Sequence, residues 1–188
     1  MKKIIQLTLS IIMISNLSNG YSQNINEAIQ NIRKNFAAIE SSITNGDYQK
    51  KTVEFENSEN NEYGSITFYY NNKTLKKIVY DLVINEENNQ KTSFYVNNEK
   101  LFFVFHESTA PKVINQTKME YHYAEKRFYF KDDQPIRCLL KEYKKDSGIK
   151  ETKNEISGET ANKEVNCNEA LIYLKQFEDL MLRKDKAL

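Results

Sequence analysis

The chain has 188 residues, with 27 basic and 26 acidic side chains and a formal net charge of +1. A balance this close to neutrality gives no electrostatic reason to expect nucleic acid or an anionic membrane as a partner. The length suits one domain with a single core, which buries about two-thirds of the surface that the unfolded chain exposes.

The first residues have the pattern of a secretory signal peptide. Two lysines precede an apolar run from Ile4 to Ile14, and the small residues Gly20 and Ser22 follow it. The run is shorter than the roughly 20 apolar residues of a spanning helix. We therefore predict a signal peptide over residues 1–22 with cleavage between Ser22 and Gln23, and cleavage after Gly20 as the alternative. The mature chain should be exported to the periplasm or the extracellular space and have no membrane span.

Cys138 and Cys167 are the two cysteines of the chain. In an oxidising compartment a single pair is most simply explained by one disulfide. Closing a loop of about 30 residues would stabilise the fold by roughly 3 to 4 kcal/mol in the chain-entropy model. Two buried free thiols, or a reactive or metal-binding cysteine, remain as alternatives.

The start of the mature chain predicts an amphipathic helix. Apolar residues recur there at spacings of three and four: Ile25, Ala28, Ile29, Ile32, Phe36, Ile39 and Ile43. This periodicity predicts a helix over residues 26–44 with one apolar stripe. Asn45 and Gly46 end it, because glycine takes the left-handed conformation that closes a helix at low cost.

The middle of the chain changes to the period of β-structure. Segments rich in aromatic and β-branched residues alternate with turns rich in Asn and Asp. They predict seven strands: Thr52–Glu56, Gly64–Tyr70, Leu75–Ile84, Thr92–Val96, Lys100–His106, Tyr121–Phe130 and Ile136–Tyr143. The short connections predict an antiparallel meander. Leu101–Phe105 is apolar on both faces and should lie near the sheet centre, with a helix on at least one side.

The end of the chain predicts a loop and a second helix. Residues 144–165 lose apolar periodicity, and we expect a flexible loop there. Asn166 and Glu169 suggest a capping box, and a stripe containing Leu174 and Phe177 follows. Both helices need an apolar surface, which one face of the sheet would provide. We therefore predict one α+β domain over residues 23–188: an antiparallel β-meander of about seven strands with N-terminal and C-terminal helices packed on the sheet.

A weak internal repeat runs through the strands. Its copies begin at Phe68, Phe94 and Tyr129, and each reads as an aromatic pair, an Asn- or Asp-containing turn and an aliphatic residue that opens the next strand. These hairpins resemble the strand-turn-strand units of variant MORN-type repeats. The whole plan resembles uncharacterised small secreted proteins of Bacteroidota, a resemblance that implies no activity.

Tyrosine is in excess among the strands. Tyr69, Tyr95 and Phe130 occupy near-equivalent repeat positions and would form a possible binding face for a protein or glycan. The alternative is that such rings lie half-buried under the helices or pair across strands.

The residues that could carry chemistry are few. Glu120 and His122 share a face of one predicted strand, and His106 could approach them from a neighbouring strand. No pair of ligands has a spacing specific for a metal, no nucleophile motif or phosphate-binding loop is present, and Cys138 has no marked base. We therefore predict no catalytic residues, no metal site and no cofactor.

Three function classes follow from these observations. The first is an exported, non-enzymatic binding or protein-interaction module for an unknown protein or small-molecule ligand. The second is a structural or assembly component of the cell envelope. The third is a hydrolase-like enzyme with an unrecognised site, which should hold His106 or His122 in a concave pocket.

Overall fold

The computed structural model describes residues 24–85, 87–150 and 152–184. The predicted signal peptide over residues 1–22, with its cleavage site at Ser22 and Gln23, lies outside them. Within the described ranges, no helix combines the length and the apolar character needed to cross a membrane.

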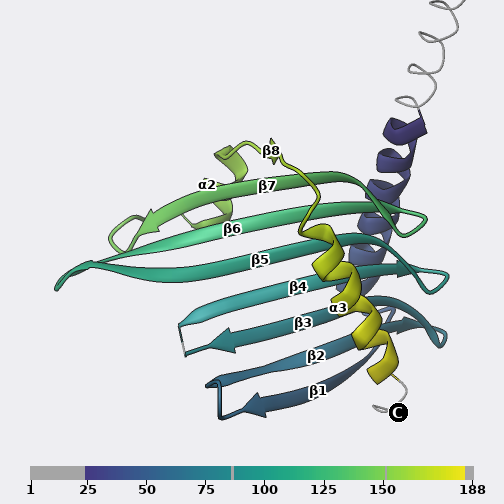
Figure 1. Ribbon diagram of the computed structural model, residues 1–188, viewed down its shortest axis with the longest axis horizontal. Helices are drawn as coiled ribbons and strands as arrows, with labels where there is room; N and C mark the ends of the chain where they lie inside the picture. Colours follow the sequence, from purple (N-terminus) through teal and green to yellow (C-terminus); the bar gives the residue numbers. More distant parts are fainter. Residues whose placement is uncertain (1–23, 86, 151, 185–188) are drawn as a thin grey trace, which may run out of the picture.

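The fold is α+β, and its centre is one eight-stranded antiparallel sheet in which every strand lies beside its neighbours in sequence (Figure 1). The strands are β1 (Gln49–Asn57), β2 (Glu62–Asn71), β3 (Thr74–Ile84), β4 (Asn88–Asn97), β5 (Lys100–Asn115), β6 (Lys118–Lys131), β7 (Gln134–Asp146) and β8 (Lys163–Glu164). The predicted meander is confirmed, with β8 as an additional short strand at one edge.

Two central strands are longer than the sequence predicts. β5 continues past His106 to Asn115, and β6 begins at Lys118 instead of Tyr121. The two extensions pair with each other and form an arm that projects beyond the rest of the sheet (Figure 1). Its tip carries exposed apolar residues, including Val113, which is 70% exposed.

Three hairpin turns lie at the same end of the sheet. Each has two consecutive residues with positive φ, as in the pair Asn98 and Glu99, and in each hairpin the strand that leaves the turn contains a β-bulge. The extra residues are Lys76, Phe102 and Ile136, and the register of the partner strand shifts opposite each of them, for example between Tyr129 and Phe130. When the three hairpins are aligned at their bulges, Phe128 matches Phe68 and Phe94. The third copy of the repeat therefore begins at Phe128, one residue before its predicted start.

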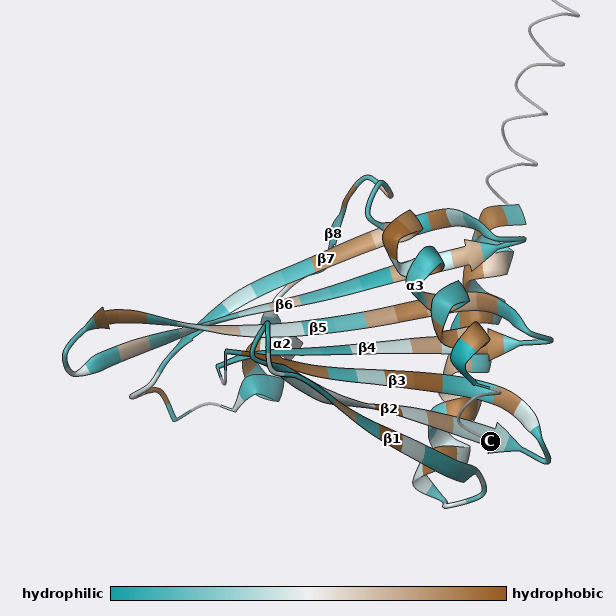
Figure 2. Ribbon diagram, turned by 60° about the horizontal axis from the view of Figure 1, so that its bottom comes forward, coloured by the Kyte–Doolittle hydropathy of each residue, from teal (hydrophilic) through white to brown (hydrophobic). Residues whose placement is uncertain are grey.

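The two long helices cover opposite faces of the sheet (Figure 1). The N-terminal helix, described over residues 24–44, packs Ile29, Ile32 and Ile39 against one face. α3 (Ala170–Arg183) packs Phe177 and Leu180 against the other face. The expectation that one face serves both helices is therefore wrong, because successive residues of a strand point to opposite faces and both sets are apolar in the central strands. Figure 2 shows apolar parts of the strands at the end that the helices cover, and a further apolar stretch at the tip of the arm.

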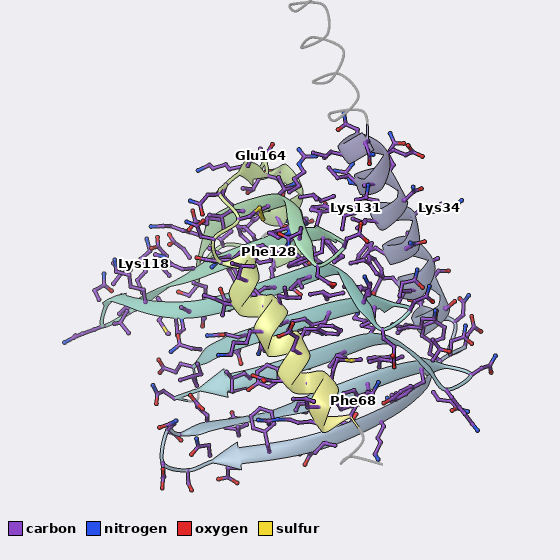
Figure 3. The ribbon with its side chains drawn as sticks, turned by 45° about the vertical axis from the view of Figure 1, so that its right-hand side comes forward. Lys34, Phe68, Lys118, Phe128, Lys131 and Glu164 are labelled. Carbon is purple, nitrogen blue, oxygen red and sulfur yellow. A yellow bond between two sulfur atoms is a disulfide. The ribbon has the colours of Figure 1, made fainter. Side chains whose placement is uncertain are left out.

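β5 is confirmed as a central strand covered on both sides. Leu101 and Val104 belong to the core under α3, whereas Phe102 and Phe103 belong to the core under the N-terminal helix. Figure 3 shows Phe68 and Phe128 on the sheet beside α3, and Lys34 on the outer side of the N-terminal helix.

The segment over residues 144–165, predicted as a flexible loop, contains regular structure. It holds the end of β7, the helix α2 (Lys153–Glu159) and β8. Thr152 and Glu155 form a capping box at the start of α2. The capping box predicted at Glu169 is wrong, because α3 has no side-chain cap and Glu169 instead binds the Lys126 ammonium at 2.6 Å.

Cys138 and Cys167 form a disulfide, with 5.4 Å between their Cα atoms. Cys138 is buried in β7, and Cys167 lies three residues before α3. The bond therefore fixes the start of α3 to the sheet, as the simplest interpretation of the two cysteines predicts.

Candidate binding site

The three aromatic residues predicted as a binding face do not form one. Tyr95 and Phe130 are 2% and 1% exposed. They also belong to the cores on opposite faces of the sheet. The position in the third hairpin that matches Tyr69 and Tyr95 is Tyr129, which is buried as well. The alternative, in which the rings pack under the helices, describes Tyr95 and Tyr129.

The two histidines lie apart on the same face of neighbouring strands. His106 pairs with Lys126 across β5 and β6, whereas His122 pairs with Ala110 on the arm. His122 binds the Glu120 carboxylate at 2.6 Å, which confirms that these two side chains meet. In the parts of the chain that the structure describes, no group of three His, Cys, Asp or Glu side chains could hold a metal ion.

His106 lines a groove between α3 and the sheet. The Nδ1 atom of His106 lies 2.9 Å from the Thr92 hydroxyl, and its ring lies against Tyr173 with 5.2 Å between centroids. Burial lowers the pKa of the imidazole to about 4, and the nearby Lys126 ammonium acts in the same direction. The ring is therefore neutral at pH 7. Ser108 and Asp179 also line the groove, without a hydrogen bond to the ring.

A more enclosed cavity of about 220 Å³ lies between the N-terminal helix and the sheet, over β5 and β6. We call it the helix pocket. It is lined by Ile32, Arg33, Phe36, Phe103, Phe105, Arg127 and Tyr129. Its sheet side is aromatic: the rings of Phe103 and Tyr129 are 4.9 Å apart, and Phe36 contacts Phe103 edge-on at 5.4 Å. None of the described residues that line it is a carboxylate, histidine, cysteine or serine.

The two guanidinium groups of the helix pocket differ in their surroundings. The Arg127 guanidinium donates to the Glu125 carboxylate and to the Asn162 amide oxygen, both at 2.8 Å, and lies 4.8 Å from the centre of the Phe105 ring. The Arg33 side chain is exposed, and among the described residues it has no ion pair or hydrogen bond. Arg33 therefore brings an uncompensated positive charge to a largely apolar cavity whose other charged side chain, Arg127, is already paired.

Hydrogen bonds to one carboxylate hold Arg127 in place. Glu125 is 5% exposed and accepts hydrogen bonds from Arg127, the Tyr143 hydroxyl at 2.9 Å and the Ser157 hydroxyl at 2.5 Å. Burial alone would raise the pKa of Glu125, but the hydrogen bonds from Ser157, Arg127 and Tyr143 hold it below its usual value. This ionised carboxylate fixes both Arg127 and α2 to the same face of the sheet.

A second polar contact fixes the N-terminal helix beside the pocket. The Glu40 carboxylate on this helix accepts from the Lys77 ammonium at 2.7 Å and from the Tyr95 hydroxyl at 3.0 Å. Burial lowers the pKa of Lys77, and the hydrogen bond that Lys77 donates to Glu40 opposes that change. Burial and the Glu40 charge raise the pKa of Tyr95. Since the unpaired ammonium would be costly to bury, the contact sets the position of the helix over the sheet.

The sequence did not reveal the helix pocket. Its walls come from three segments that are far apart in sequence, on the N-terminal helix, β5 and β6, and its aromatic positions have the same pattern as ordinary core positions. The available signal was Arg33, a charged residue directly after the stripe position Ile32.

No family model, no curated protein and no solved structure matches the chain. The resemblances to variant MORN-type repeats and to secreted proteins of Bacteroidota therefore stay predictions.

Proposed function

We propose that the protein is an exported, non-enzymatic binding module, and that it binds a small organic anion with an apolar or aromatic body in the helix pocket. The observation that carries this proposal is the uncompensated Arg33 guanidinium at an aromatic cavity. A carboxylate or phosphate group would pair with Arg33, and the apolar body would lie against Phe103 and Phe105.

The volume and the lining limit the ligand further. Cavities for drug-sized ligands measure about 300–1,000 Å³, so a space of about 220 Å³ suits a smaller molecule, such as an aryl carboxylate or a short fatty acid. The described lining offers no nucleophile and no acid or base with a carboxyl or imidazole group, which favours binding over catalysis. The disulfide supports the exported location, because such bonds persist in oxidising compartments.

A titration with three matched probes tests the proposal. Hexanoate, 1-hexanol and hexylammonium share one apolar chain and differ in the charge of the head group. Isothermal titration calorimetry should rank their affinities in that order, because only the carboxylate pairs with Arg33. Phenylpropionate should bind at least as tightly as hexanoate, since its ring contacts the aromatic wall.

Three variants locate the binding site. Arg33→Gln should weaken hexanoate about tenfold and leave hexanol unchanged, because it removes the charge and little of the apolar wall. Phe105→Leu should weaken all the probes that bind. Lys34→Gln is the matched control, since Lys34 is also exposed on this helix but does not line the pocket. Failure of every probe to bind, or hexanoate binding that Arg33→Gln leaves unchanged, would contradict the proposal.

A further inference from the structure

β1 forms a free edge of the sheet. It pairs with β2 on one side, and no described strand pairs with its other side. At the opposite edge, β8 covers only part of β7. An edge of nine residues presents a row of unpaired backbone groups, which is a template for another strand unless side chains prevent pairing.

The order of the charges along β1 is not needed if the charges serve only to prevent another strand from pairing with this edge. Lys50 and Lys51 lie in its first half, and Glu54 and Glu56 lie in its second half. None of the four has an ion pair or side-chain hydrogen bond among the described residues. A single sign of charge would be enough to repel a second copy of the same strand. Opposite signs in the two halves instead attract it, because an antiparallel copy runs in the reverse direction.

We propose that β1 pairs antiparallel with β1 of a second copy of this chain, centred on Val53, so that two sheets join across a twofold axis. In this register the whole of Gln49–Asn57 is paired, and Lys50 lies opposite Glu56 of the other copy, twice per dimer. Thr52 lies opposite Glu54, and Val53 lies opposite itself. Paired residues in this register share one face of the sheet.

The neighbouring registers fit less well. A shift of two residues toward the end of β1 places Glu54 opposite Glu54 of the other copy, a repulsive pair. A shift of two residues toward its start keeps an attractive pair, Lys50 opposite Glu54, but places Lys51 opposite Val53 and leaves Glu56 and Asn57 beyond the start of the other strand. A shift by an odd number of residues would join the α3 face of one sheet to the opposite face of the other. On the α3 face, the central register also covers Val53, which is 37% exposed.

The surface is independent of the helix pocket. The pocket lies over β5 and β6, whereas β1 is the outermost strand beyond β2, β3 and β4 (Figure 1). Failure of the dimer would therefore leave the proposed binding function untouched, and failure of ligand binding would leave the dimer untouched.

Charge reversal tests the pairing and its register. Sedimentation equilibrium should show a monomer-dimer equilibrium for the unaltered protein. Lys50→Glu and Glu56→Lys should each weaken the dimer about tenfold or more, because each replaces two attractive pairs with two repulsive ones. The double variant Lys50→Glu/Glu56→Lys should restore it. An equal mixture of the two single variants should also dimerise, since every Glu at position 50 or 56 then meets a Lys. Lys34→Glu on the N-terminal helix is the control and should leave the equilibrium unchanged.

A cross-linking pair provides a second, independent measurement. Val53→Cys places two new thiols opposite each other across the axis, so mild oxidation should link two chains. Thr52→Cys, one residue away, meets Glu54 instead and should cross-link much more slowly. A protein that stays monomeric at every concentration would overturn the proposal. A dimer that neither single charge reversal weakens, or equal cross-linking by the two cysteine variants, would also overturn it.

Discussion

His106 should make the stability of the fold sensitive to mild acid. The imidazole is 7% exposed, and burial together with the nearby Lys126 holds its pKa at about 4, against 6.5 in an unfolded chain. Glu169 and Glu107 oppose this change without reversing it. Between these two values the unfolded state binds a proton that the folded state excludes. The free energy of unfolding therefore falls as the pH falls from about 6.5 toward 4.

The size of this effect follows from the difference in pKa. A difference of about 2.5 units corresponds to roughly 3 kcal/mol when complete. About 2 kcal/mol of it should be lost between pH 7 and pH 5, because the folded-state pKa is not yet reached at pH 5.

Urea unfolding at several pH values, followed by far-ultraviolet circular dichroism, measures this effect. His106→Gln should be less stable than the unaltered protein at pH 7, since it loses the packing against Tyr173. Its stability should change less between pH 7 and pH 5, so the two curves converge on acidification. Since carboxylates titrate in both proteins, the difference isolates His106. His122→Gln, which removes the histidine on the arm, is the control. Parallel curves for His106→Gln and the unaltered protein over this window would refute the reasoning.

Two further predictions concern one glycine and the disulfide bond. Gly64→Ala should lower the free energy of unfolding by about 2 to 3 kcal/mol, because an added Cβ would lie 2.0 Å from the backbone oxygen of Asp81. Gly148→Ala is the control in the same urea titration, since no atom lies within 4 Å of its added Cβ, and equal stability of the two variants would contradict this account. Reduction of the Cys138–Cys167 bond, which spans 29 residues of sequence, should lower the free energy of unfolding by about 3.5 kcal/mol in the chain-entropy model. Urea titrations with and without reductant measure the difference, and a change below about 1 kcal/mol would mean that the bond hardly restricts the unfolded chain.

Local pattern was enough to predict most of the elements. The apolar stripe from Ile25 to Ile43 predicts the N-terminal helix, and the aromatic segments with Asn and Asp turns predict β1 to β7 in meander order. Local pattern failed at the arm, where Pro111 and a run of polar residues hide the extensions of β5 and β6, which stabilise each other by pairing. It also failed at α2. The capping signal of Thr152 and Glu155 is present there, but seven residues are too few for an apolar stripe.

The candidate site could not be predicted, because it depends on which face each residue occupies. Tyr129 and Phe130 are adjacent in β6, so the ordinary alternation of side chains along a strand places them in cores on opposite sides of the sheet. An error of one residue in aligning the third hairpin therefore exchanges the two faces. The helix pocket adds a second requirement, since Arg33 meets Phe103 and Phe105 only after the N-terminal helix has packed on the sheet.

The two helices contribute separate cores on one shared sheet, and a double-mutant cycle can test whether these cores act independently. Ile39 is buried under the N-terminal helix, and Phe177 is buried in α3 on the other side. Ile39→Val should lower the free energy of unfolding by about 1 kcal/mol, and Phe177→Leu by a similar or somewhat larger amount. The two side chains belong to different clusters and have the sheet between them, so the losses should add within about 0.5 kcal/mol.

Urea titrations of both single variants and the double variant give the coupling energy. A coupling above about 1 kcal/mol would show that the bulged strands transmit strain from one core to the other.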